Sequence, residues 1–186
     1  MFIQTEDTPN PSTVKFIPGQ TILESGTMDF SSLEDASKSP LAVRLFGIVG
    51  VNRVFLSSDF VSVSKADDTD WSMLKPMVLA LLMEHLSTNQ PILEEGHASQ
   101  DANSEEDDDE VTQQIKELLN ERVRPMVAQD GGDIVFERFD NGVVYLQMRG
   151  ACSGCPSSTA TLKVGIENML RHYIPEVQEV RPSPEY

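Results

Sequence analysis

Two cysteines, the only ones in the chain, lie in the stretch Gly150-Ala151-Cys152-Ser153-Gly154-Cys155-Pro156-Ser157-Ser158. The residues before this stretch, Val143 to Arg149, have the pattern of a β-strand, and those after it have the spacing of a helix. A C-x-x-C turn between a strand and a helix brings two thiolates to one point, and soft thiolates select zinc, copper(I) or iron–sulfur clusters. The helix N-terminus beyond them favours negative charge, which stabilises thiolates and an anionic cluster alike. The motif therefore predicts a metal or cluster site at Cys152 and Cys155.

The number of ligands limits this site. Structural zinc sites and common iron–sulfur clusters use four protein ligands. The chain has two cysteines, and its three histidines, His85, His97 and His172, have no ligand-like spacing to them. One chain therefore cannot complete such a site, whereas two chains can. The spacing predicts a metal or cluster that two copies share, or that one copy holds half-open for a partner.

Other roles for the cysteine pair stay open on the sequence. A C-x-x-C pair can be the dithiol of a thiol–disulfide oxidoreductase, and cysteines without a ligand can pack as small hydrophobes. No βαβ pattern is evident around Cys152 and Cys155, and Pro156 directly follows the second cysteine, so a ligand-binding loop is favoured over a redox motif. A zinc ion bridged between two chains is a further alternative.

Small residues are expected to shape this loop. Gly150, Gly154 and Pro156 allow the backbone to fold around a ligand, and Ser153 is expected to offer its backbone N–H to a sulfur. A second glycine-containing turn, Asp130-Gly131-Gly132-Asp133, precedes the strands. Its aspartates have no catalytic companions in the sequence, so we interpret them as turn residues.

The part of the chain around the cysteines predicts a small sheet packed with helices. Asn141-Gly142 is the strongest short signal for a hairpin with a type I′ turn. Pro125 should end or kink the helix before it, and Ser157 or Ser158 should cap the helix after the cysteines. The expected strands are 134–139, 143–149 and 177–180, and the expected helical stripes are 111–123 and 162–173.

The first half of the chain predicts a second small domain of the same mixed type. Ser31-Ser32-Leu33-Glu34 has the spacing of a capping box and predicts a short helix that starts at Ser31. We expect Trp71 to anchor the core and His85, at the edge of a helical stripe, to be half-exposed and not a ligand. The expected strands are 14–17, 51–56 and 60–64, and further helices are expected from Pro40 and around 74–85. The predicted fold class is therefore α/β in the mixed, α+β sense.

Composition changes abruptly between Pro91 and Glu110. This segment has nine carboxylates and no lysine or arginine, and almost nothing apolar follows Leu93. Like charges repel, and the segment has no apolar surface to bury. We therefore predict an acidic flexible linker over 91–110 between a domain at 1–90 and a domain at 111–186.

Charge and length exclude several kinds of partner. The 186-residue chain has 14 basic and 30 acidic residues, a formal net charge of −16, which argues against binding nucleic acid or an anionic membrane. No apolar run approaches the roughly 20 residues of a membrane span. The segment from Met1 to Asp7 has neither the features of a secretory signal nor the Arg-rich character of an import peptide. With cysteines that suit a reducing compartment, we expect a bacterial cytoplasmic protein, the alternative being a mature form in the mitochondrial matrix.

Several spaced blocks together resemble one known family. Four blocks of the second half are similar to the NifU-like C-terminal domain of the Nfu iron–sulfur carrier proteins: Asp130-Gly131-Gly132-Asp133-Ile134, Gly150 to Ser158, Thr161-Leu162-Lys163 and Ile174-Pro175-Glu176-Val177. Three blocks of the first half are similar to the domain that precedes it in that family: Phe2-Ile3-Gln4-Thr5, Thr8-Pro9-Asn10-Pro11 and Lys15-Phe16. The resemblance covers nearly the whole chain apart from roughly residues 93–108.

This resemblance implies a binding protein and not an enzyme. It implies that Cys152 and Cys155 ligate a [4Fe-4S] cluster shared with a second copy of the chain. It also implies delivery of the cluster to apo-proteins, a supply from upstream cluster assembly proteins, and a docking role for the N-terminal domain.

Overall fold

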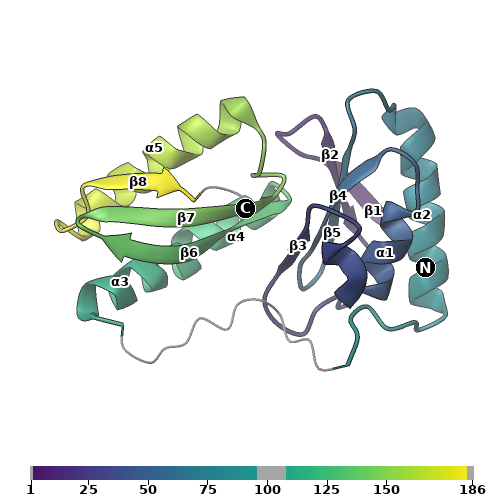
Figure 1. Cartoon of the computed structure of the whole chain (residues 1–186), viewed down its shortest axis with the longest axis horizontal. Helices are drawn as coiled ribbons and strands as arrows, with labels where there is room; N and C mark the ends of the chain where they lie inside the picture. The colour runs from purple at the N-terminus through teal and green to yellow at the C-terminus, as the bar shows by residue number, and fades with distance from the viewer. Residues whose placement is uncertain (1, 96–107, 184–186) are drawn as a thin grey trace. The chain divides into compact units, whose positions relative to one another are not determined.

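The computed structural model describes residues 2–95 and 108–183 of a chain that forms two compact units, Met1–Ala102 and Asn103–Tyr186 (Figure 1). Each unit packs helices against its own β-sheet, so the predicted mixed α/β class with two domains is confirmed. Among the described residues, no helix has the length and apolar character needed to cross a bilayer.

The first unit is a five-stranded antiparallel sheet with helices on one face (Figure 1). Its strands, in the order β1-β2-β5-β4-β3, are β1 (Gln4–Asp7), β2 (Thr13–Ile17), β3 (Met28–Phe30), β4 (Val51–Leu56) and β5 (Val61–Lys65). Its helices are a 3-10 turn η1 (Asp35–Lys38), α1 (Pro40–Phe46) and α2 (Trp71–Ser87). Alternate strand residues such as Phe16, Val54 and Val63 are fully buried with Leu45 and Leu82 of the helices, as the period of a strand requires.

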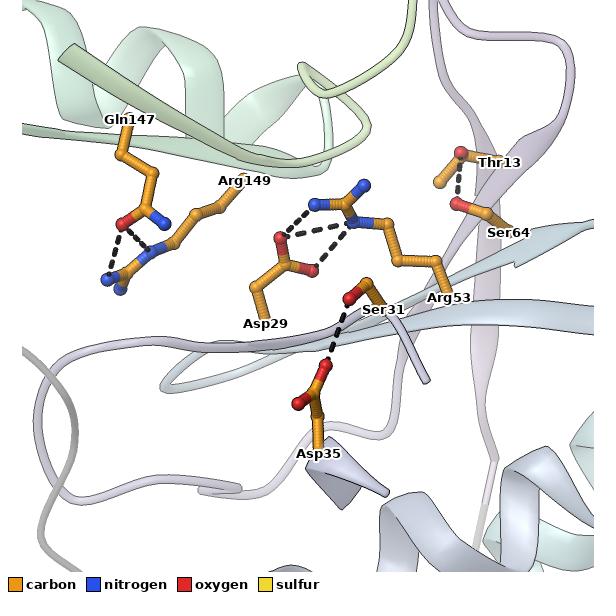
Figure 2. A network of polar contacts seen from close by, with 8 residues as sticks. All are labelled: Thr13, Asp29, Ser31, Asp35, Arg53, Ser64, Gln147 and Arg149. Carbon is orange, nitrogen blue, oxygen red and sulfur yellow. Dashed lines mark hydrogen bonds and ion pairs between the residues drawn. The ribbon is translucent and has the colours of Figure 1, made fainter. Parts of the chain in front are cut away.

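Polar side chains occupy the positions that alternate with this core (Figure 2). The hydroxyls of Thr13 and Ser64 on paired strands lie 2.6 Å apart. Arg53 donates to both carboxylate oxygens of Asp29, with Nη2 2.7 Å from Oδ2 and Nε 3.0 Å from Oδ1. This bidentate pair links β4 to the edge strand β3.

Three details of the first unit differ from the sequence expectations. The helix expected at Ser31 begins only at Asp35, because Ser31 Oγ donates to the Asp35 side chain while Ser32 Oγ accepts from its N–H (Figure 2). Trp71 is only partly buried against the core, and its Nε1 donates to the Pro11 carbonyl. His85 was expected to be half-exposed and is fully buried.

Most of the predicted acidic linker, residues 96–107, lies outside the described residues. Its first residues pack on the first unit, where Ile92 and Leu93 contact the core and the Ile92 carbonyl accepts from Ser39 Oγ at 2.6 Å. At the other end Asp109 caps a helix of the second unit by accepting from the N–H of Thr112 at 2.8 Å. Residues at both ends of the predicted linker therefore contact folded structure.

The second unit contains a three-stranded sheet, β6-β7-β8, and its helices pack with the sheet into one core (Figure 1). The strands are β6 (Gly132–Asp140), β7 (Val143–Gly150) and β8 (Glu179–Pro182); the helices are α3 (Glu110–Leu118), the π-helical turn η2 (Leu119–Val123), α4 (Arg124–Gln129) and α5 (Pro156–Tyr173). The hairpin prediction is confirmed, since Asn141 and Gly142 have φ of 47° and 80°, the signs that a type I′ turn requires.

One expectation for this unit is wrong. β7 and β8 pair in parallel, so β7, the cysteine loop, α5 and β8 form a βαβ unit around the motif, where none was evident from the sequence. A final strand was expected at 177–180 and lies at Glu179–Pro182, but its parallel pairing with β7 was not predicted. Pro125 was expected to end or kink the helix before it; the π turn η2 directly precedes it, and α4 begins at Arg124 with Pro125 in its first turn, where a residue that lacks an N–H is accommodated.

Candidate metal centre

The two cysteines lie in a tight loop between β7 and α5. Gly150 and Gly154 adopt left-handed φ of 63° and 73° on either side of Cys152 and let the chain reverse there, as expected for loop-shaping glycines. The N–H of Ala151 donates to the Gly131 carbonyl at 3.2 Å, which ties the loop to the turn before β6. The N–H of Ser153 was expected to face a sulfur; it donates instead to the Gly150 carbonyl at 3.1 Å.

The helix after the loop begins earlier than expected. Cys155 occupies the N-cap position and Pro156 the first helical turn, so neither Ser157 nor Ser158 is the cap residue. Proline is favoured at that place because its missing N–H would have no intrahelical partner. Thr159 fixes the geometry from within the helix, since its Oγ1 donates to the Cys155 carbonyl at 2.6 Å. The second cysteine is therefore held at the positive end of α5.

Gly132 brings the start of β6 directly against the first cysteine. A Cβ atom at this position would lie 2.6 Å from Sγ of Cys152 and 2.9 Å from its backbone N. It would also lie 2.7 Å from the Arg149 carbonyl oxygen. Residues 131–133 are thus the floor of the cysteine loop, in contact with it without a side chain between.

Both thiols are buried, and Cys152 packs in the hydrophobic core of the second unit. Burial raises the pKa of Cys152 to about 12, and the charges of Asp130, Asp133 and Cys155 add to this rise. The free thiol is therefore protonated at neutral pH. A metal or cluster must displace that proton to bind, so binding is coupled to proton release.

Asp133, the last residue of this floor, forms an ion pair. Arg124 donates to Asp133 through Nε and Nη2, at 2.9 Å and 2.8 Å, and the Asp133 side chain is only 5% exposed. Arg149, the strand partner of Asp133, is also buried, and its guanidinium bonds the Gln147 side chain on the same strand (Figure 2). Arg124 is not among the candidate residues predicted from the sequence; its position next to Pro125, before the Asp-Gly-Gly-Asp turn, was the available signal.

Neither of the two histidines that the structure describes belongs to a metal-binding group with the cysteines. His85 belongs to the first unit and is buried there, and His97 lies outside the described residues. His172 is on α5, about 24 Å along the helix axis from its first residue at 1.5 Å per residue. Across the described ranges 2–95 and 108–183, no group of three or more His, Cys, Asp or Glu side chains is arranged to hold a metal ion.

Comparison with known proteins matches the two halves of the chain to two family models. The family model "Scaffold protein Nfu/NifU N terminal" matches residues 3–90, and the "NifU-like domain" model matches residues 115–181. The chain is 51% identical over 181 residues to the human protein named NFU1 iron-sulfur cluster scaffold homolog, mitochondrial, and covers 71% of it. The chain belongs to the Nfu family. The resemblance inferred from the spaced sequence blocks is therefore confirmed.

Two Drosophila proteins with the same name are also similar to the chain. The Drosophila willistoni protein of that name is 52% identical over 97% of this chain, which spans only 63% of that relative's length. The Drosophila persimilis Nfu protein is also 52% identical, with 64% of its length covered. A solution NMR structure of a NifU-like protein from Saccharomyces cerevisiae matches 51% of the chain at 24% identity, with a TM-score of 0.46.

Proposed function

We propose that this Nfu protein is an iron–sulfur cluster carrier that binds a [4Fe-4S] cluster through Cys152 and Cys155 of two chains and delivers it to apo-proteins. The main support is the donor set of the loop: two soft thiols in a turn that contains two left-handed glycines, in a chain of a family named for cluster scaffolds. The described residues offer no third ligand nearby, which favours sharing between two copies. The role is binding and transfer of the cluster as cargo.

The thiol–disulfide oxidoreductase is the alternative from another class. The βαβ unit around the cysteines removes one sequence argument against it. A second argument replaces that one: redox cysteines have lowered thiol pKa values, whereas burial and two carboxylates raise the pKa of Cys152. Cluster binding is the better match, because the metal ions supply the charge that stabilises buried thiolates.

Location and partners follow from the relatives' names only. Those relatives are named mitochondrial, so we favour the mitochondrial matrix for this chain over the bacterial cytoplasm that the sequence analysis preferred. The proposed partners are a second copy of the chain, upstream cluster assembly proteins and apo-proteins that receive the cluster. The first unit is proposed to dock these partners.

The test is anaerobic reconstitution of the full chain with iron and sulfide, followed by a count of iron, sulfide and zinc per chain. Wild type should absorb broadly near about 400 nm and contain iron and sulfide. Cys152→Ser and Cys155→Ser should each abolish stable binding, because each change removes two of the four ligands of a symmetric site. A Ser variant with a full complement of iron and sulfide would disprove the shared site. A colourless protein that binds zinc would favour the zinc alternative.

A further inference from the structure

The π turn η2 sets the position of Arg124. The N–H of Arg124 donates to the Leu119 carbonyl, five residues back, where an α-helix would use the fourth. This widening admits Pro125 directly afterwards. It also changes the direction in which residue 124 leaves the helix, because a π turn has more residues per turn than an α turn. Extra residues of this kind are frequent at functional sites.

Arg124 donates hydrogen bonds to both oxygens of one buried carboxylate, that of Asp133. Its Nε donates to Asp133 Oδ1 at 2.9 Å and its Nη2 to Oδ2 at 2.8 Å, while Nη1 donates to Asn120 Oδ1 at 3.2 Å. Asp133 Oδ1 also accepts from the N–H of Ile134 at 2.8 Å. The planar fork of arginine can satisfy both carboxylate oxygens at once, whereas lysine would supply a point charge.

The Arg124–Asp133 pair includes one residue of the floor of the cysteine loop. Asp133 directly follows Gly132, where a Cβ atom would lie 2.6 Å from Sγ of Cys152, and Asp133 pairs with Arg149 in the ladder. Asp133 is 3% exposed, so water screens its charge poorly. Loading of the loop places further negative charge here, since the thiolates and the cluster they hold are anionic together. A buried carboxylate without its cation would repel that cargo.

We propose that Arg124 is a positioning residue of the cysteine loop, acting through Asp133: it fixes the floor beneath Cys152 and cancels the carboxylate charge that would oppose an anionic cluster. The charge part rests on the proposed function. The positioning part concerns the unloaded chain and does not depend on it.

Charge-changing variants of the full chain test the first part. Arg124→Gln should lose a reconstituted cluster about tenfold faster than wild type, because the buried carboxylate then loses the neighbouring charge of Arg124. Arg122→Gln is the matched control: it removes the same charge from the same turn, but Arg122 lies over the Tyr173 ring, 5.1 Å from its centroid, and its loss should leave the rate within about twofold.

The carboxylate variants separate charge from mere stability. Asp133→Asn breaks the same ion pair but leaves no buried negative charge, so it should lose the cluster more slowly than Arg124→Gln, and adding it to Arg124→Gln should slow the loss from the double variant. Arg124→Lys, which keeps the charge, should retain the cluster better than Arg124→Gln. An ion pair with only a structural role would make Arg124→Gln and Asp133→Asn equally poor carriers, and that result would overturn the charge part.

Hydrogen exchange of the unloaded chain tests the positioning part. The N–H of Ala151 is held by the Gly131 carbonyl, so its exchange rate reports whether the floor keeps its place under the loop. Arg124→Gln should speed this exchange about tenfold relative to Arg122→Gln. Equal exchange in the two variants would overturn the positioning part. If wild type took up no iron and sulfide, the proposed function would be disproved. The exchange experiment would still test the positioning part.

Discussion

Gly132 sets how closely the start of β6 approaches the first cysteine. Its backbone φ is not left-handed, so the position requires glycine for space and not for conformation. The close neighbours of the missing Cβ include the backbone N of Cys152 and the carbonyl oxygen of Arg149, which cannot swing aside as a flexible side chain can. A methyl group here must move the cysteine loop itself.

Gly132→Ala should therefore destabilise the second unit by about 1–3 kcal/mol, the usual cost of overpacking, and lower the iron bound after reconstitution. Gly165→Ala is the matched control, because a Cβ at that position on α5 meets nothing within 4 Å. The control should be neutral or more stable by up to about 1 kcal/mol, since alanine favours a helix over glycine. Urea unfolding and iron content measure both effects. A Gly132→Ala protein as stable and as fully loaded as wild type would show that the loop has room that the structure does not indicate.

At the scale of elements, His85 joins α2 to α1 and to the segment after α2. Its Nδ1 lies 3.3 Å from Arg44 Nη1, and its Nε2 lies 3.2 Å from the Pro91 carbonyl. Arginine can only donate, so Nδ1 must accept and Nε2 must donate, which is the neutral tautomer. Burial lowers the pKa of His85; the Arg44 charge adds to this, while the Pro91 carbonyl and Glu84 partly oppose it.

This packing predicts a loss of stability on mild acidification. Above pH 6.5, the ordinary value, His85 is neutral in both the folded and the unfolded chain and the first unit has its full stability. As the pH falls below 6.5, the unfolded chain binds the proton more readily, so the free energy of unfolding falls until the lower folded pKa is reached. His85→Gln should flatten this slope, whereas His172→Gln should not. Fluorescence of Trp71, the only tryptophan, follows unfolding of this unit in urea. Equal slopes in wild type and His85→Gln would exclude His85 as the group responsible.

At the scale of the whole molecule, the net charge opposes the association of two copies, whereas the number of ligands per chain favours it. Each chain has a net charge of −16, so two copies repel each other in the absence of a link. A cluster shared by four thiolates supplies that link, and anything that binds only the assembled state shifts the equilibrium toward it. The proposed cluster therefore controls assembly as well as function.

Cluster loading should raise the dimer fraction, and added salt should raise it further by screening the repulsion. Transfer of the cluster to an apo-acceptor should return the chain to its unloaded state of assembly. Anaerobic sedimentation before loading, after loading and after addition of the acceptor measures each step. The Cys152→Ser chain, treated in the same way, controls for assembly without a cluster. A monomer with four irons on one chain would disprove shared ligation.

The sequence by itself determined the features that depend on near neighbours. Two thiols at one turn follow from the spacing of Cys152 and Cys155, and the hairpin follows from Asn141-Gly142, because residues a few positions apart meet whatever the rest of the chain does. The stripes of apolar residues likewise indicated most strands and helices, while short strands such as Met28–Phe30 escaped because they offer too few residues for a period.

Only the tertiary structure decided the features that depend on distant segments meeting. The parallel pairing of β7 with β8, the burial of His85 and the contact of Gly132 with Cys152 each join parts of the chain whose separate patterns do not specify the encounter. The Arg124–Asp133 pair needs a π turn, and a change of one residue in helical register would direct that arginine elsewhere. Local preferences determined the position of the two cysteines; packing determined the residues beneath them and the charges around them.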